Sequence, residues 1–356
     1  MNVTAVQDRI GRICAGTLDS RDLRHRVLAE IRSVVPFSWY AWLLTDPETS
    51  VGAAPLAQVP PSLISRLPTM IRLKYLTKVN RWTALDSSPA FLHRATSGEL
   101  DRSLLWRDLL RDYSVVDIAS LVFRDRFGCW GFLDLWRDAG SPPFDTVEAS
   151  VLAGAIEPIT NGLRRSQAAT FAAPPDESGP SVVPDSPAVA GPVVLLLSPE
   201  LEVLDRTAHT SEYLRLLVPP DEGRAPIPAG AYNVAAQLLA VEAGVDTNVP
   251  TARVHLLNGR WLSLRAARLA DGAQANIAVT FEDATATQRL SLFARCCGLS
   301  PRETELLGLL PSGRSTRELA ARLYVSEHTV QDHLKSIFAK TGVRTRPALL
   351  SRALGA

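Results

Sequence analysis

The 356-residue chain is poor in cysteine, and its four cysteines do not form a metal-binding pattern. Cys14 and Cys129 stand far apart, whereas Cys296 is followed directly by Cys297. There is no C-x-x-C spacing and no histidine at zinc-finger distance, which argues against a zinc site and a disulfide framework. A disulfide between adjacent cysteines would be strained, so we expect buried thiols there and predict no metal and no cofactor.

Long apolar runs, an export signal and catalytic patterns are also missing. No stretch approaches the roughly 18 apolar residues of a transmembrane helix, and the segment after Met1 lacks the basic region of a secretion signal. Residues 1–294 show no arrangement of nucleophile, base and acid, and the chain has no Gly-Lys dipeptide for a P-loop. We therefore expect a cytoplasmic protein that contacts no membrane and is not an enzyme.

Charge is distributed unevenly along the chain. The formal net charge is +1, but residues 295–356 hold ten Arg or Lys against five Asp or Glu. This tail therefore carries +5, which leaves +1 − 5 = −4 for residues 1–294. A basic end on an acidic body predicts a surface for a polyanion, with nucleic acid as the first candidate.

Proline marks a boundary between domains. The segment from Ala172 to Pro192 contains six prolines and no apolar periodicity, so it predicts an interdomain linker over residues 169–191. Residues 1–168 read as an α+β domain with an antiparallel sheet. Its clearest elements are a helix at Asp19–Val34, strands at Val115–Arg124 and Cys129–Arg137, and a closing helix at Thr146–Arg164.

Residues 192–283 predict a second α+β domain. Strand-like runs lie at Val193–Leu197, Glu202–Asp205 and Ala275–Phe281, and Asn258-Gly259 is the strongest hairpin signal in the chain. A connector helix over residues 284–298 then leads into the tail. The first block resembles GAF domains and the second resembles PAS domains. Two packing modules without a ligand remain an equal alternative, because a fold does not fix a function.

The tail, residues 299–356, carries the start signals of four helices. Ser300-Pro301-Arg302-Glu303 combines a capping box with proline in the first turn, and Ser315 to Glu318 repeats the capping box. Ser326 caps a third helix whose apolar stripe is Val330, Leu334, Ile337 and Phe338. Pro347 opens a fourth helix. Four short helices, with a tight turn between the second and third, predict a helix-turn-helix.

This segment resembles the LuxR/NarL-type DNA-binding domain nearly end to end. The resemblance rests on the Leu-Ser-Pro-Arg-Glu start, Glu318-Leu319-Ala320, Val325-Ser326, Thr329-Val330, His333, Ile337, Lys340 and the Gly-Val-Arg-Thr-Arg run from Gly342. It implies that the third helix lies in the major groove of double-stranded DNA. It also implies a homodimer on a palindromic operator, with RNA polymerase as a further partner. The dimer contact would come from the fourth helix, through Leu349, Leu350 and Leu354.

The resemblance also assigns DNA contacts to individual residues. Base-edge candidates lie on the outward side of the third helix: Gln331, Asp332, Lys335 and His328. Gln can pair with adenine, Lys with guanine, and Asp with cytosine N4. A carboxylate at position 332 departs from the small or apolar residue expected there, and a neutral surface role is an equal alternative. Phosphate-contact candidates are Arg302, Arg317, Ser326, Thr329, His333, Lys340, Arg344 and Arg346.

The signal that controls the tail would enter through the N-terminal domains. A ligand pocket in the first domain could be lined by aromatic residues: Trp39, Tyr40, Trp42, Trp106, Phe123, Trp130 and Phe132. By strand alternation, Trp130 and Phe132 share one face. The alternative is a ligand-independent regulator whose N-terminal domains bind a partner protein.

Overall fold

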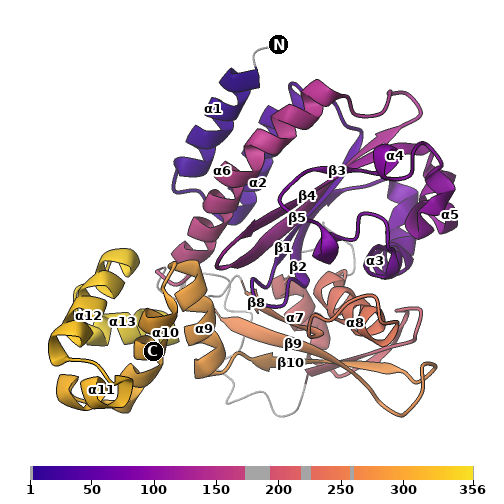
Figure 1. Ribbon diagram of the computed structural model, residues 1–356. Coiled ribbons are helices and arrows are strands. Elements are labelled where there is room, and N and C mark those ends of the chain that lie inside the picture. The colour runs from indigo at the N-terminus through magenta and orange to yellow at the C-terminus, as the bar shows by residue number, and fades with distance from the viewer. Residues whose placement is uncertain (1–2, 173–192, 218–225, 257–259, 356) are drawn as a thin grey trace.

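The computed structural model describes residues 3–172, 193–217, 226–256 and 260–355. Two antiparallel sheets with their helices lie next to each other, and a set of short helices at the C-terminus lies at their side (Figure 1). Two α+β units followed by a helical unit is the predicted fold class. Within these residues, no helix combines the length and apolarity needed to cross a membrane.

The first sheet has five strands in the order β2-β1-β5-β4-β3 and is covered by helices on both faces (Figure 1). The strands are β1 (Trp39–Thr45), β2 (Gly52–Gln58), β3 (Ala90–Phe91), β4 (Val115–Asp125) and β5 (Gly128–Asp138). One face is covered by α2 (Ser20–Arg32) and α6 (Thr146–Thr170), and α1 (Val3–Ala15) packs against these two helices. The other face packs against α3 (Leu67–Leu76), α4 (Leu92–Ala95) and α5 (Leu104–Asp108).

A β-bulge in β5 separates two aromatic residues that we expected on one face. Consecutive residues of β4 pair with Cys129 and Gly131, so Trp130 is an extra residue in β5. An extra residue shifts the alternation of side chains between the faces. Trp130 packs in the core beneath α2 and α6, whereas Phe132 stacks on Trp82 on the opposite face, with ring centroids 5.2 Å apart. The prediction of a shared face was wrong.

The second sheet repeats the topology of the first. Its order, β7-β6-β10-β9-β8, is the same arrangement when the strands of each sheet are counted from one to five. The predicted turn at Asn258-Gly259 lies outside the described residues, but the strands on either side of it pair with His255 opposite Trp261. The elements are β6 (Val193–Leu197), β7 (Val203–Arg206), α7 (Thr210–Leu217), α8 (Ala229–Glu242), β8 (Thr251–His255), β9 (Trp261–Arg268) and β10 (Ile277–Asp283).

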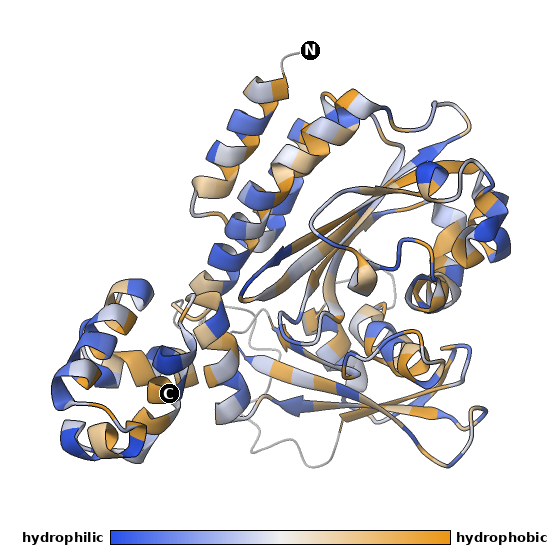
Figure 2. Ribbon diagram, viewed as in Figure 1, coloured by the Kyte–Doolittle hydropathy of each residue, from blue (hydrophilic) through white to orange (hydrophobic). Residues whose placement is uncertain are grey.

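Helix α8 joins the two units into one packed body. It contacts α3 and β2 of the first unit as well as β9 of the second. A largely apolar helix belongs in an interior, and eleven of the fourteen residues of α8 are buried, with Asn233 and Gln237 as the polar ones among them. Figure 2 shows many hydrophobic residues along the strands of both sheets. Buried residues of α3, α8 and the second sheet belong to one apolar cluster, so the core is continuous between the two units.

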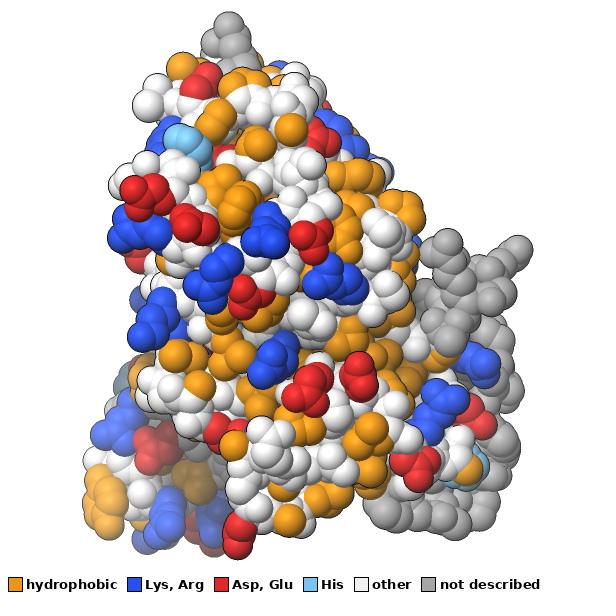
Figure 3. All heavy atoms as spheres, turned by 90° about the vertical axis from the view of Figure 1, so that its right-hand side faces the viewer, with side chains coloured by type: hydrophobic (Ala, Val, Ile, Leu, Met, Phe, Trp, Pro, Cys, Tyr) orange, Lys and Arg blue, Asp and Glu red, His pale blue; other side chains and the backbone are white. Residues whose placement is uncertain are grey.

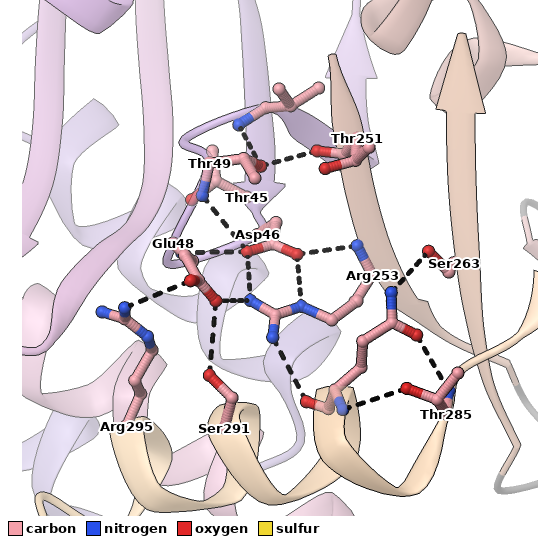
Figure 4. Close-up of polar contacts among 12 residues, drawn as sticks. Thr45, Asp46, Glu48, Thr49, Thr251, Arg253, Ser263, Thr285, Ser291 and Arg295 are labelled. Carbon is pink, nitrogen blue, oxygen red and sulfur yellow. Dashed lines mark hydrogen bonds and ion pairs between the residues drawn. The ribbon is translucent and has the colours of Figure 1, made fainter. Parts of the chain in front are cut away.

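A buried ion pair also connects the two units (Figure 4). Arg253 on β8 donates from Nε to Oδ2 of Asp46, in the β1–β2 loop, at 2.7 Å and from Nη2 to Oδ1 at 2.7 Å. The backbone N–H of Arg253 donates to the same carboxylate at 2.8 Å. Burial alone would lower the pKa of Arg253, but the hydrogen bonds and charge of Asp46 outweigh burial and raise it. The guanidinium of Arg253 therefore stays charged.

The same guanidinium reaches the connector helix α9 (Ala286–Cys296), which begins within two residues of the predicted position. Nη1 of Arg253 donates to the carbonyl of Gln288 at 3.2 Å, and Nη2 donates to Glu48 at 2.9 Å. Glu48 in turn accepts from Ser291 and pairs with Arg295, both on α9 (Figure 4). We call the group of Asp46, Glu48 and Arg253 the clasp. It ties both sheets to the helix that leads into the tail.

We expect Arg253→Met to lower the free energy of unfolding by about 3 to 5 kcal/mol, because Asp46 would remain charged and buried without its partner. Urea unfolding followed by tryptophan fluorescence measures this, since all seven tryptophans precede residue 284. Arg66→Met is the control, because Arg66 and Asp112 form an exposed pair that should contribute about 0 to 1 kcal/mol. Equal losses in both variants would show that the clasp does not stabilise the body.

Candidate nucleic-acid interface

The tail helices begin where their capping residues predict. They are α10 (Pro301–Leu309), α11 (Thr316–Leu323), α12 (Glu327–Thr341) and α13 (Arg346–Leu354). The side chain of Ser300 accepts from the N–H of Glu303, whose carboxylate accepts from the N–H of Ser300. Ser315 and Glu318 form the same reciprocal pair at the start of α11. Both predicted capping boxes are confirmed, and so is the N-cap of α12 at Ser326.

The turn between α11 and α12 contains a residue that the sequence did not single out. Tyr324 ends α11 with φ +57°, a left-handed conformation that is strained for an aromatic residue. Its side chain is 94% exposed. The turn at Gly313 and the end of α12 at Gly342 also have positive φ, but a glycine in the sequence makes a left-handed conformation predictable at those two positions. A tyrosine carries no such signal.

Helix α12 separates an apolar face from a polar one, as its sequence predicts. Val330, Leu334 and Ile337 are buried against the neighbouring helices, and Phe338 is half-buried. The four base-edge candidates are exposed on the other side: His328, Gln331, Asp332 and Lys335. One surface of one helix thus presents donors and acceptors of different kinds, which is the chemistry needed to read base edges.

Three of these four side chains form a chain of ion pairs. Asp332 lies 3.3 Å from Nζ of Lys335 through Oδ1 and 3.4 Å from Nε2 of His328 through Oδ2. Their spacing of three and four residues places them on adjacent turns of one helix face. All three side chains are more than half exposed, so solvent screens the pairs and leaves them available to rearrange.

The phosphate-contact candidates differ in their present contacts. Arg317 and Arg344 are exposed. Arg346 donates to Oγ1 of Thr316 at 2.9 Å, which ties the start of α13 to that of α11. Two of the remaining candidates form ion pairs, Arg302 with Glu305 and Lys340 with Glu303. The hydroxyl groups of Ser326 and Thr329 form a hydrogen bond at the N-terminus of α12, and His333 is half-buried.

Glu303 locks α10 onto α12. Its carboxylate accepts from Nζ of Lys340 at 2.6 Å and from Oγ of Ser336 at 2.6 Å, while it also completes the capping box of Ser300. Burial alone would raise the pKa of Glu303, but the hydrogen bonds from Lys340, Ser336 and Ser300 outweigh burial and lower it to about 2. Lys340 therefore has a structural partner besides any phosphate that it could contact.

The fourth helix, α13, packs against the connector helix. Leu349 is fully buried, and Leu350 and Leu354 are half-buried. Helix α13 contacts α9, and Leu349 belongs to the same apolar cluster as Leu292 and Phe293 of α9. Part of the helix for which we expected a dimer contact thus lies against its own chain.

The aromatic residues considered for a ligand pocket divide between the two faces of the first sheet. Tyr40, Trp42, Phe123 and Trp130 pack on the side of α2 and α6, whereas Trp39, Trp106 and Phe132 pack on the side of α3 and α5. Trp42, Phe123, Trp130 and Phe132 have no exposed surface. These residues therefore belong to two separate cores.

The cysteines are free thiols, and of the adjacent pair that we expected to be buried, Cys296 is buried and Cys297 is half-buried. All four are unpaired in the structure, and Cys14, Cys129 and Cys296 are buried. Burial raises the pKa of Cys297 to about 12 and that of Cys296 well above its ordinary value. Because the thiolate is the reactive form, neither member of the adjacent pair is activated.

The C-terminal helices form a LuxR-type helix-turn-helix domain. Residues 298–353 match the family described as "Bacterial regulatory proteins, luxR family". The chain is 41% identical over 71 residues to "Probable HTH-type transcriptional regulator GfsR" of Streptomyces halstedii, covering 20% of this chain and 29% of that protein. It is 41% identical over 56 residues to "Oxygen regulatory protein NreC" of Staphylococcus aureus, covering 16% and 26%.

A third relative is "Transcriptional regulatory protein MctR" of Rhizobium johnstonii, at 39% identity over 56 residues, covering 16% of this chain and 26% of that protein. The matched part of the chain spans less than a third of the length of these curated relatives. The likeness therefore concerns the helix-turn-helix region.

We expect Glu303→Gln to destabilise the tail by about 2 to 3 kcal/mol at pH 7. A carboxylate whose pKa is lowered on folding stabilises the folded state above its unfolded pKa, so this contribution is lost as the pH falls from about 4.5 to about 2. The difference between variant and wild type should shrink over that range in urea melts followed by circular dichroism. Glu305→Gln is the control, since its pair with Arg302 is exposed. A difference that does not change with pH would contradict the assignment.

Proposed function

We propose that this protein is a dimeric, sequence-specific DNA-binding transcription regulator. The observation that carries the proposal is the exposed polar face of α12 in a LuxR-type helix-turn-helix. Residues 295–356 add a formal charge of +5, which favours a polyanion at this end of the chain. On the face of the molecule shown in Figure 3, by contrast, acidic and basic side chains are interspersed.

In this proposal, α12 enters the major groove and the surrounding cations hold the phosphate backbone. Gln331, Asp332, Lys335 and His328 contact base edges. The N–H groups at the start of α12 add the positive end of a helix dipole near the backbone. Arg317 and Arg344 are accessible for phosphate contacts because both are exposed. A two-fold dimer through α13 would read palindromic half-sites about one helical turn apart and then engage RNA polymerase.

The N-terminal GAF-like and PAS-like units would control this activity in the cytoplasm. Support comes from the clasp, since a change in either unit that moves Asp46, Glu48 or Arg253 also moves α9. Helix α9 in turn covers part of α13. A small ligand or a protein partner could supply the signal. The dense packing of the aromatic residues in two separate cores favours a protein partner over a ligand held between those residues.

Two substitutions should separate base reading from backbone binding. We expect Lys335→Ala to relax the selected sequence at one position of each half-site, at a cost of about 1 to 3 kcal/mol in discrimination. Arg344→Ala should weaken binding to all duplexes alike and reduce the slope of log affinity against log salt by about one. Selection of random duplexes by the full chain at two salt concentrations measures both. Failure of the wild-type chain to enrich any sequence would contradict the proposal.

The clasp predicts a resting state in which α9 restrains the tail. Glu48 is half-exposed and binds Arg253, Arg295 and Ser291, so Glu48→Gln should loosen α9 without leaving a buried charge. We expect the affinity of the full chain for DNA to rise. Glu200→Gln is the control, because it makes the same charge change on an exposed turn. An unchanged or lower affinity in Glu48→Gln would exclude this restraint.

A further inference from the structure

A carboxylate on a DNA-facing surface needs an explanation. Asp332 lies near the middle of the exposed face of α12, where its charge repels phosphates and lowers the affinity for every sequence alike. The carboxylate has two ion-pair partners on the same helix. Nζ of Lys335 lies 3.3 Å from Oδ1, and Nε2 of His328 lies 3.4 Å from Oδ2. The three side chains therefore present one acceptor and one strong donor next to each other.

This donor and acceptor match the edge of one base pair. In the major groove a C·G pair shows the N4 donor of cytosine beside the O6 acceptor of guanine, with guanine N7 as a second acceptor. Those two groups are hydrogen-bonded to each other, so they lie about 3 Å apart. The separation of 3.3 Å between Nζ of Lys335 and Oδ1 of Asp332 is of the same size. We infer that Asp332 and Lys335 together read a single C·G base pair in each half-site, an inference that rests on the proposed function.

Other base pairs fit this pair of side chains less well. A carboxylate can only accept and an ammonium can only donate. Guanine gives the ammonium two neighbouring acceptors, whereas thymine gives it one acceptor beside a methyl group. Reversing the pair to G·C exchanges donor and acceptor and places the carboxylate against guanine O6. Asp332 thus converts its general repulsion of DNA into selection for one pair in one orientation.

In this arrangement His328 positions Asp332 instead of contacting a base edge itself. Its Nε2 lies 3.4 Å from Oδ2 of Asp332, and His328 lies about two turns closer to the start of α12 than Lys335. It leaves Oδ1 as the oxygen on the side of Lys335. Gln331, the next residue along the exposed face, remains available to read a separate base.

Selection of random duplexes by the full chain tests the inference with three variants. Asp332→Asn and Lys335→Met should lose preference at the same single position, where the wild type selects C·G, and discrimination there should fall about tenfold to a hundredfold. Asp332→Asn should also bind unselected DNA more tightly. Glu305→Gln is the matched control, since it removes one similarly exposed carboxylate from α10 and should leave the selected sequence unchanged.

The remaining outcomes overturn the inference in distinguishable ways. If the wild type selects a palindrome but Asp332→Asn selects the same one with equal strength, Asp332 does not read a base and the proposed function stands. If the two variants lose preference at different positions, the residues do not share a base pair. If the wild type selects no sequence while all four proteins give the same helical circular dichroism, both the inference and the proposed function fail.

Discussion

The contact between Arg253 and Asp46 constrains the rest of the molecule. Removing two charges from water costs several kcal/mol for each ion, and only close, well-oriented hydrogen bonds offset that loss. Here the carboxylate receives three of them from one residue, at 2.7 to 2.8 Å. Either charge alone would be strongly unfavourable in this buried position. The ion pair therefore fixes the position of the β1–β2 loop relative to β8. The contact from the same guanidinium to Gln288 extends that relation to α9.

This arrangement explains how two sheets and a helical tail can act as one protein. Helix α8 fills the space between the sheets with apolar contacts, which have no directional requirement. The clasp adds directional contacts, since its hydrogen bonds form only when the two units lie in this one orientation. Helix α9 then packs on one side against α6 of the first unit and on the other against α10 and α13 of the tail. A change in the body therefore has a continuous path of contacts to the helix-turn-helix.

The sequence predicts local features of this structure well and long-range ones poorly. Ser300, Ser315 and Ser326 mark helix starts correctly because an N-cap depends on residues within one turn. The bulge at Trp130 was missed, since its pairing with β4 decides it and the neighbouring Gly131 does not by itself specify an extra residue. The clasp was missed as well, because Asp46 and Arg253 are 207 residues apart in the chain. On α12 the spacing of the exposed residues was predictable, but the ion pairs of Asp332 depend on rotamers.

The most direct test of the account is an interference experiment with the full chain on its selected duplex. Methylation of guanine N7 blocks the major groove and leaves the minor groove open. If α12 reads bases as a dimer, methylated guanines should abolish binding in two clusters whose centres lie about 10 base pairs apart. Binding that tolerates N7 methylation throughout the selected site would contradict the claim that α12 occupies the major groove.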